Sequence, residues 1–348
     1  MQTILTALSG GVDSAVTAGL LLRQGCRVGG ATMLLRPGGE SEAEDAAAAA
    51  RRLGIPFHLF SWQEAFAQAV IAPFAEVYRA GGTPNPCVFC NRALKFGRFL
   101  DAALALGYDG IATGHYARVD YDAASGRYLL RTARDAAKDQ TYMLARLDQR
   151  QLGHTVLPLG AYTKAQVRQL AGELGLVEQA AKGDSQDICF VPDGDYLGFL
   201  RRWGLTPQPG RFRDEAGRDL GPHRGYEGYT VGQRRGLGLS AGSRLYVVAK
   251  PRPDVVVGGP EALYTRDAVA AEMNWIPWET PPREFRAEAR LRYTAKPAPC
   301  AVRVEGDRAF LRFDEPQRAV TPGQTAVLYD GELVLGGGVL VESAKERR

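Results

Sequence analysis

Long apolar runs are absent from this chain. No stretch approaches the roughly 18 apolar residues that cross a bilayer, and no basic, signal-like segment follows Met1. We therefore expect a soluble, cytoplasmic protein that does not enter a membrane. Cysteine is also scarce, because the 348 residues include only five, an odd number. This count argues against a disulfide framework and favours reactive or metal-binding thiols.

Two common nucleotide-binding signatures are absent as well. A Walker A loop needs Gly-Lys-Ser/Thr, yet the first lysine of the chain is Lys95. No G-x-G-x-x-G fingerprint occupies the first strand–helix turn, where residues 9–14 read Ser-Gly-Gly-Val-Asp-Ser. The glycines let the backbone approach an oxyanion, and the helix N-terminus that follows favours a phosphate. Asp13 would be repelled by bare phosphate, so we expect it to help hold Mg²⁺.

The first half of the chain alternates strand and helix patterns. This rhythm predicts a doubly wound parallel α/β sheet, Rossmann-like in outline, with ligands at the carboxyl ends of its strands. Ser41–Glu44 resembles a capping box that opens a helix. The predicted strands are Thr3–Leu8, Arg27–Leu35, Ile55–Phe60 and Gly110–Thr113, and the predicted helices are Ala15–Gln24, Ser41–Leu53, Gln63–Arg79, Asn91–Leu106 and Thr163–Leu174.

The character of the sequence changes near Pro207–Gly210. From there onward, short β-type runs alternate with Gly and Pro turns, which predicts two small β-rich domains, the last a β-barrel. We expect domains at residues 1–205, 206–272 and 273–348. The tail Lys345–Arg348 is expected to be disordered.

Three cysteines attract attention by their surroundings. Cys87 and Cys90 follow two prolines just before a helical pattern, so Cys90 should lie near a helix N-terminus with a lowered pKa. Cys189 follows Lys182–Asp187, a polar segment typical of a mobile loop, whereas Cys26 and Cys300 fit structural positions. Cys87 and Cys90 match half of a zinc site or a redox pair, and the three together match an iron–sulfur cluster with one open iron position. The spacing of these cysteines does not distinguish a zinc site, a redox pair and an iron–sulfur cluster.

Charge is distributed unevenly. Residues 201–252 contain eleven basic and four acidic side chains, whereas residues 1–80 contain six basic and seven acidic ones. Such a local excess fits a surface that contacts a phosphate backbone. A solvated charged face in an arginine-rich protein is the alternative interpretation.

Several motifs, taken in order, resemble the tRNA-specific 2-thiouridylase family of PP-loop, N-type ATP pyrophosphatases. The resemblance runs over nearly the whole chain, and it is specific because independent motifs occur in the right sequence. They are residues 9–14, Thr83–Asn91, Gly114–Tyr116, Lys138–Gln140, Asp184–Phe190, Tyr229–Leu237, Arg292-Tyr293, Thr321–Gln324 and Leu335–Leu340.

The resemblance implies an ATP-dependent 2-thiolation of the wobble uridine in tRNA. It also implies a persulfide-donor protein as partner, and we expect a monomer. Cys90 would be the nucleophile and Cys189 the persulfide carrier, and the two would end as a disulfide. The residues implied to contact ATP are Ala7, Leu8, Ser9, Gly10, Gly11, Val12, Asp13, Ser14, Met33 and Gly114. Those implied to face the target base are Asn85, Pro86 and Cys87. Those implied to contact the rest of the tRNA are Lys138, Asp139, Gln140, Arg292 and Tyr293.

One position departs from the family pattern. Many members have Asp where this chain has Cys87, so Cys87 would be either a base or a ligand of an iron–sulfur cluster shared with Cys90 and Cys189. Two other functions stay open from the sequence. One is a different PP-loop adenylating enzyme, such as an amide-forming synthetase, and the other is a nucleotide-dependent tRNA-binding protein without catalysis.

Overall fold

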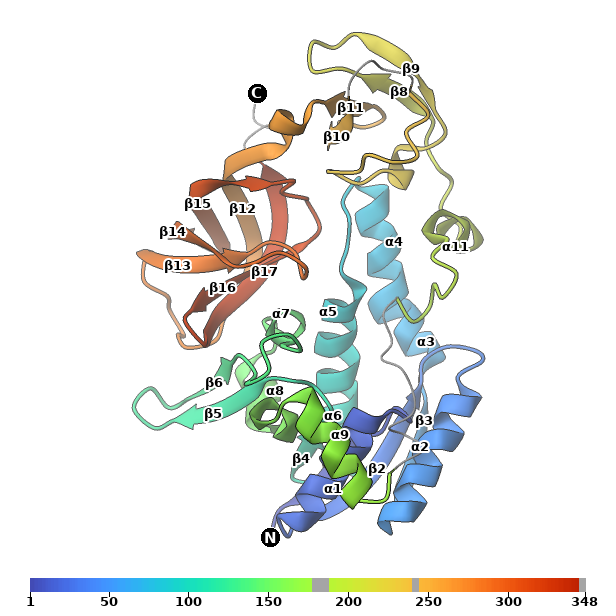
Figure 1. Cartoon of the computed structure of the whole chain (residues 1–348), viewed down its shortest axis with the longest axis vertical. Coiled ribbons are helices and arrows are strands. Elements are labelled where there is room, and N and C mark those ends of the chain that lie inside the picture. Colours follow the sequence, from blue (N-terminus) through green and yellow to red (C-terminus); the bar gives the residue numbers. More distant parts are fainter. Residues whose placement is uncertain (177–187, 240–243, 344–348) are drawn as a thin grey trace.

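The N-terminal half is built on a five-stranded parallel sheet. The computed structural model describes residues 1–176, 188–239 and 244–343 (Figure 1). The strand order is β3-β2-β1-β4-β7, and every pairing is parallel. The order reverses beside β1, so the crevice for a ligand lies at the carboxyl ends of β1 and β4. The strands are β1 (Thr3–Ala7), β2 (Arg27–Leu34), β3 (Phe57–Ser61), β4 (Gly110–Ala112) and β7 (Thr155–Val156).

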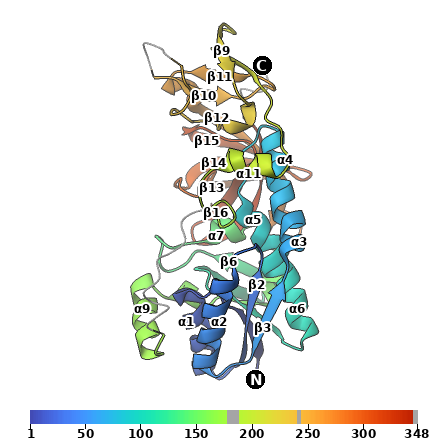
Figure 2. The same cartoon turned by 90° about the vertical axis from the view of Figure 1, so that its right-hand side faces the viewer.

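Helices cover both faces of this sheet, which confirms the predicted doubly wound α/β domain (Figure 2). One face carries α1 (Val12–Arg23), α2 (Glu40–Leu53) and α9 (Lys164–Glu173), and α1 contacts both of the others. The other face carries a continuous helix made of α5 (Pro86–Cys90), η2 (Asn91–Arg98) and α6 (Phe99–Ala105). A second long helix, composed of α3 (Gln63–Phe66), η1 (Ala67–Ile71) and α4 (Ala72–Arg79), runs toward the middle of the molecule.

The predicted capping box at Ser41–Glu44 is wrong. Helix α2 already begins at Glu40, and Gly39 before it provides no side-chain cap. Ser41 therefore lies inside the first turn, where its hydroxyl contacts the Glu42 carboxylate at 3.5 Å. Capping boxes occur instead at Asp148–Gln151 and Thr163–Gln166.

A hairpin and short helices follow β4 in the chain. They are β5 (Arg118–Asp122), β6 (Arg127–Arg131), α7 (Thr141–Leu144), α8 (Gln149–Gly153) and η3 (Pro158–Ala161). The sequence patterns did not predict this hairpin. Figure 1 shows it extending away from the parallel sheet toward the C-terminal region.

The middle of the chain forms a small four-stranded sheet with the order β10-β11-β8-β9. Its core gathers Phe212, Tyr226, Val247, Val255 and Val257. The elements are α11 (Tyr196–Arg202), β8 (Gly210–Arg213), β9 (Asp219–His223), η4 (Tyr226–Gly228), β10 (Tyr246–Ala249), β11 (Val255–Gly258) and η5 (Pro260–Leu263).

The C-terminal strands close into the predicted barrel, because β12 pairs with both β15 and β17. The strands are β12 (Tyr264–Trp275), β13 (Glu284–Arg290), β14 (Ala298–Glu305), β15 (Arg308–Arg318), β16 (Thr325–Asp330) and β17 (Leu333–Ser343). Leu333 of β17 also pairs with Arg131 of β6, so the barrel sheet continues into the hairpin. The predicted boundary between residues 272 and 273 falls within β12, and the division into domains stays a prediction.

Two further predictions concern segments at the limits of the description. Lys182–Asp187 and the tail Lys345–Arg348 lie outside the described residues. Across the described ranges, the helices are all too short or too polar to span a bilayer.

Candidate active site

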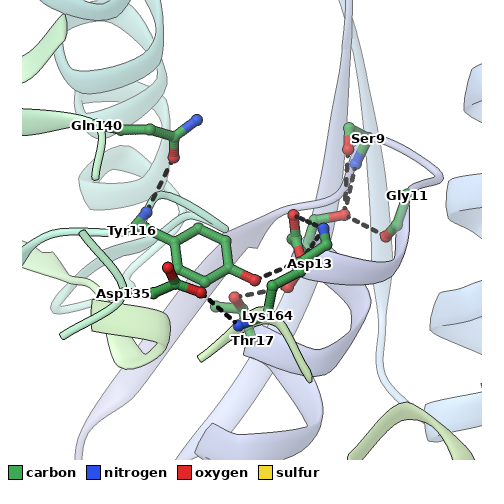
Figure 3. A network of polar contacts seen from close by, with 9 residues as sticks. Ser9, Gly11, Asp13, Thr17, Tyr116, Asp135, Gln140 and Lys164 are labelled. Atoms are coloured by element: carbon green, nitrogen blue, oxygen red, sulfur yellow. Dashed lines mark hydrogen bonds and ion pairs between the residues drawn. The ribbon is translucent and has the colours of Figure 1, made fainter. Parts of the chain in front are cut away.

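The loop from β1 to α1 is held by its own serines. The Ser14 hydroxyl accepts from the Ser9 amide at 3.1 Å and donates to the Gly11 carbonyl at 3.0 Å (Figure 3). Gly10 has a φ of +75°, and a Cβ there would lie 2.8 Å from the Asp45 Cβ. Only glycine fits such a conformation without strain. Contacts within the chain therefore define the shape of this loop.

Gly114 packs directly on this loop. A Cβ at Gly114 would lie 2.9 Å from the Ser14 amide nitrogen, so only glycine lets the end of β4 approach the first turn of α1. Met33, at the end of β2, packs against the core of the sheet domain. The predicted ATP residues thus gather at the carboxyl ends of β1, β2 and β4, while their contact with ATP stays a prediction.

Asp13 is not a free metal ligand in this structure. The Lys164 ammonium donates to both of its carboxylate oxygens, at 2.9 and 2.7 Å, and the Tyr116 hydroxyl donates to one of them at 2.9 Å (Figure 3). The described part of the chain contains no cluster of three or more His, Cys, Asp or Glu side chains arranged for a metal. The sequence analysis assigned no role to Lys164 or Tyr116.

Helix α5 presents the first two cysteines of interest. It begins at Pro86, and the Asn85 side chain caps it by accepting from the Cys87 amide at 3.2 Å. Cys90 therefore lies at the end of the first turn, where it is buried. Burial raises the pKa of Cys90 to about 11, although Lys95 acts in the opposite direction. The predicted lowering of this pKa is wrong, because desolvation outweighs both the nearby cation and the helix dipole.

The three thiols of residues 87, 90 and 189 are electrostatic neighbours. Each has a raised pKa, first because of burial, and Cys189 and Cys87 raise the pKa of Cys90 further. Lys95 lowers the pKa of all three, and Arg36 also lowers that of Cys189. All five cysteines are free thiols. The three thiols thus lie within electrostatic range of one lysine, Lys95, but within the described residues they do not form a group arranged to hold a metal.

Cys189 and Cys90 are connected through an aromatic core. Phe190, the residue after Cys189, packs edge-on against Phe66 and Phe74 at centroid distances of 5.5 and 5.2 Å. Cys90 belongs to the same apolar cluster. Nearby, burial lowers the pKa of His115 to about 3, and its Nδ1 lies 2.7 Å from the Thr113 hydroxyl. His115 is therefore neutral at pH 7.

Most residues expected to contact tRNA have partners within the chain. Asp139 accepts from the Ala133 amide and the Thr141 hydroxyl, and Gln140 accepts from the Tyr116 amide at 2.9 Å. Arg292 donates to the carbonyls of Val231 and Ala319, which ties the middle region to the barrel. Lys138 also has an intramolecular interaction. Tyr293 is partly exposed, and for all five residues the tRNA contact stays a prediction.

Within the basic middle region, five of the arginines fall into two contrasting groups. Arg211, Arg213 and Arg218 form ion pairs with Asp219, Asp254 and Asp214. Arg234 and Arg235 are exposed, and their side chains make no ion pair or hydrogen bond within the described ranges. The second group is therefore available to an external anion.

Sequence profiles of three domain families match the chain in order. The tRNA methyl transferase HUP domain matches residues 2–193, the tRNA methyl transferase PRC-barrel domain residues 198–258, and the aminomethyltransferase β-barrel domain residues 265–340. Among solved structures the overall likeness is weak. The U34-tRNA thiolase NcsA from Methanococcus maripaludis, solved with its [4Fe-4S] cluster, is 17% identical with a TM-score of 0.35 over 58% of this chain and 63% of that one.

Full-length relatives give a much closer match. The tRNA-specific 2-thiouridylase MnmA of Carboxydothermus hydrogenoformans is 47% identical over 97% of both chains. That of Syntrophotalea carbinolica is 48% identical over 96% of this chain and 97% of its own. With this identity over nearly its whole length, and with the loop and cysteines described above, the chain belongs to the tRNA-specific 2-thiouridylase family.

Proposed function

We propose that this chain catalyses the ATP-dependent 2-thiolation of the wobble uridine in tRNA. As a family member it is a tRNA sulfurtransferase, and its relatives are named for 2-thiolation of tRNA. The observation that carries the proposal is the preformed loop of residues 9–14, packed on Gly114, in the same domain as three neighbouring thiols. One domain thus combines a phosphate site with a sulfur site.

The first step is adenylation of the uracil C2 oxygen. This oxygen attacks the α-phosphate of ATP, the bond between the α and β phosphates breaks, and pyrophosphate leaves. The poor leaving group at C2 becomes AMP, which is a good one. The loop amides and the N-terminus of α1 stabilise the negative charge that develops on the departing pyrophosphate.

Magnesium would neutralise phosphate charge when bound with ATP. The residues present do not form a ready site for it, because Lys164 and Tyr116 occupy the Asp13 carboxylate.

In the second step sulfur replaces AMP. We propose that Cys189 receives sulfur from a donor protein as a persulfide. Either the terminal sulfur attacks C2 and displaces AMP, after which Cys90 attacks the Cys189 sulfur and breaks the S–S bond to release the 2-thiouridine, or Cys90 attacks the persulfide first and releases sulfide, which then attacks C2 and displaces AMP. Both routes end with a disulfide between Cys90 and Cys189 that an external thiol must reduce, while AMP departs. Lys95 supports the anionic sulfur, since it lowers the pKa of all three thiols.

The role of Cys87 divides the proposal into two versions. In one version Cys87 handles the proton at the target base, in place of the family's Asp. In the other, Cys87, Cys90 and Cys189 hold an iron–sulfur cluster. The described residues contain no group of three or more His, Cys, Asp or Glu side chains already arranged to bind a metal. Anaerobic purification with iron analysis separates the two, since full activity in iron-free protein would eliminate the cluster.

The proposal extends to the tRNA contact surface, the oligomeric state, the location and the domains of the protein. We propose that tRNA lies along the basic middle region and the Lys138–Gln140 segment, with residues Asn85–Cys87 at the target base and Arg292 and Tyr293 beside it. The exposed Arg234 and Arg235 support this orientation. We also propose a monomer that acts in the cytoplasm, with domains at residues 1–205, 206–272 and 273–348.

In vitro thiolation tests the proposed function. Purified protein, unmodified tRNA, ATP and a sulfide or persulfide source should yield 2-thiouridine at the wobble position, detected by mass spectrometry of nucleosides. Omission of ATP should abolish the product. An ATP–pyrophosphate exchange that needs a small carboxylic acid and no tRNA would instead identify an amide-forming synthetase.

A further inference from the structure

Lys164 is a buried lysine bound to the phosphate loop. Its residue is only 7% exposed, yet its ammonium lies 2.9 and 2.7 Å from the two oxygens of Asp13. The same ammonium lies 5.9 Å from the centre of the Tyr116 ring. Figure 3 shows the lysine and the tyrosine converging on Asp13 from one side while Ser9 and Gly11 lie on the other. A cation 151 positions away in sequence thus reaches the loop.

The fold holds this lysine firmly in position. Thr163 and Gln166 form a capping box at the start of α9, and the Lys164 amide donates to the Asp135 carboxylate at 2.9 Å. Val167 and Ala171 of α9 pack in one apolar cluster with Val16 and Leu20 of α1. The first residue of α9 is therefore fixed beside the first turn of α1.

The position of Asp13 creates a chemical conflict that Lys164 resolves. A carboxylate in an anion-binding loop repels phosphate, and the Walker lysine that usually offsets phosphate charge is absent from this loop. Lys164 is buried, and taking a carboxylate partner away from a buried cation without supplying another anion is unfavourable. Exchanging Asp13 for a phosphate oxygen keeps the ammonium paired throughout.

We propose that Lys164 is an ATP-binding residue that rests on Asp13 in the nucleotide-free enzyme and moves to the phosphates when ATP binds. The Tyr116 hydroxyl, which donates to Asp13 at 2.9 Å, is the second partner of this carboxylate. The inference rests on the proposed function, in which the loop of residues 9–14 holds ATP.

The alternative is that the ion pair only fastens α9 to α1. A second ion pair offers a matched control, since Arg23 of α1 binds Glu173 of α9 at 3.1 Å, on the surface and at the other end of the same two helices. Arg23→Met removes this ion pair between α1 and α9 and does not change the loop of residues 9–14. Its affinity for ATP should equal that of the wild type.

Calorimetric titration of the full chain with ATP, and separately with adenosine, tests the proposal. Lys164→Met should weaken ATP binding roughly tenfold or more and leave adenosine binding unchanged, because a charge-assisted contact to phosphate is lost. Lys164→Arg should recover part of the affinity. In EDTA, Asp13→Asn should bind ATP several-fold more tightly than the wild type, since the competing carboxylate is gone.

Three results would overturn the inference. The first is ATP binding by Lys164→Met equal to that of the wild type. The second is a joint loss of ATP and adenosine affinity in that variant with a lower unfolding temperature, and the third is weaker ATP binding by Asp13→Asn in EDTA. The double variant Asp13→Asn with Lys164→Met removes both charges of the ion pair. It therefore replaces the single lysine variant if that variant does not fold. It too should lose affinity for ATP and keep its affinity for adenosine. Failure of the wild type to bind ATP would count against the proposed function instead.

Discussion

The two halves of the active site differ in how far they are prepared. The phosphate loop is arranged in advance, with Ser9 and Ser14 hydrogen-bonded and Asp13 paired. In the sulfur site, desolvation raises the pKa values of all three thiols, although only Cys90 is buried and Cys87 and Cys189 are exposed at the surface. With a pKa of about 11, only about 10⁻⁴ of Cys90 is thiolate at pH 7.

This difference suits an enzyme with two steps in a fixed order. A thiolate that formed before adenylation would be susceptible to oxidation. A phosphate loop whose backbone is already arranged has no comparable liability. We infer that adenylation proceeds on prepared geometry, and that the sulfur site becomes reactive only when persulfide and tRNA change its surroundings.

The largest effect is expected from removing a sulfur. Cys90→Ser and Cys189→Ser should each reduce thiolation at least about 10³-fold, since an alcohol cannot replace the sulfur nucleophile or carrier. ATP binding by calorimetry should stay unchanged in both, because the loop is arranged separately. Persistent 2-thiouridine formation in either variant would contradict the thiol mechanism, and Cys300→Ser in the barrel is the matched control.

Lys95→Met should produce the next largest effect. Removing this cation takes away the influence that lowers the thiol pKa values, so alkylation of Cys90 at a given pH should slow roughly three- to tenfold. Because the reactive thiolate accumulates as pH rises toward about 11, the wild-type rate should climb about tenfold per pH unit below that value. Iodoacetamide labelling with peptide mass spectrometry measures both. An unchanged rate would show that Lys95 does not act on the thiols.

A smaller effect is expected on tRNA affinity. The double change Arg234→Ala with Arg235→Ala should weaken binding by about tenfold and reduce the slope of log affinity against log salt by roughly 1.5, if each arginine contacts one phosphate. Filter binding at several salt concentrations measures the slope. Arg218→Ala is the control, since Arg218 is already paired with Asp214. An unchanged slope in the double variant would remove this surface from the interface.

The smallest effect concerns the start of α9. Thr163→Ala removes a capping hydrogen bond and should lower the free energy of unfolding by about 1 kcal/mol. ATP affinity should fall only slightly, because packing against α1 still holds Lys164 in place. Urea denaturation and calorimetry measure the two quantities. A large loss of affinity would mean that the cap, rather than the packing, positions the lysine.

Local patterns were enough to predict the turn between β1 and α1 and the parallel sheet around it. Two glycines between an apolar strand and a helix specify their own conformation, so the turn at Gly10 needs no distant information. The pKa of Cys90 was predicted in the wrong direction because its burial depends on Phe190 and Phe66, which come from other segments. Lys164 was missed for a similar reason, since its ion pair with Asp13 joins residues 151 positions apart.

The pairing of Leu333 with Arg131 has a consequence for the modularity of this chain. A protein cut before β12 would lose the pairing of Arg131 at the end of β6, and the buried Tyr142 hydroxyl would lose the Thr325 carbonyl that accepts from it at 2.7 Å. Open strand edges invite association with other chains, and a buried hydroxyl without a partner is costly. The barrel is therefore not an exchangeable attachment, and grafting another domain in its place would require a redesigned β6 and a replacement for Tyr142.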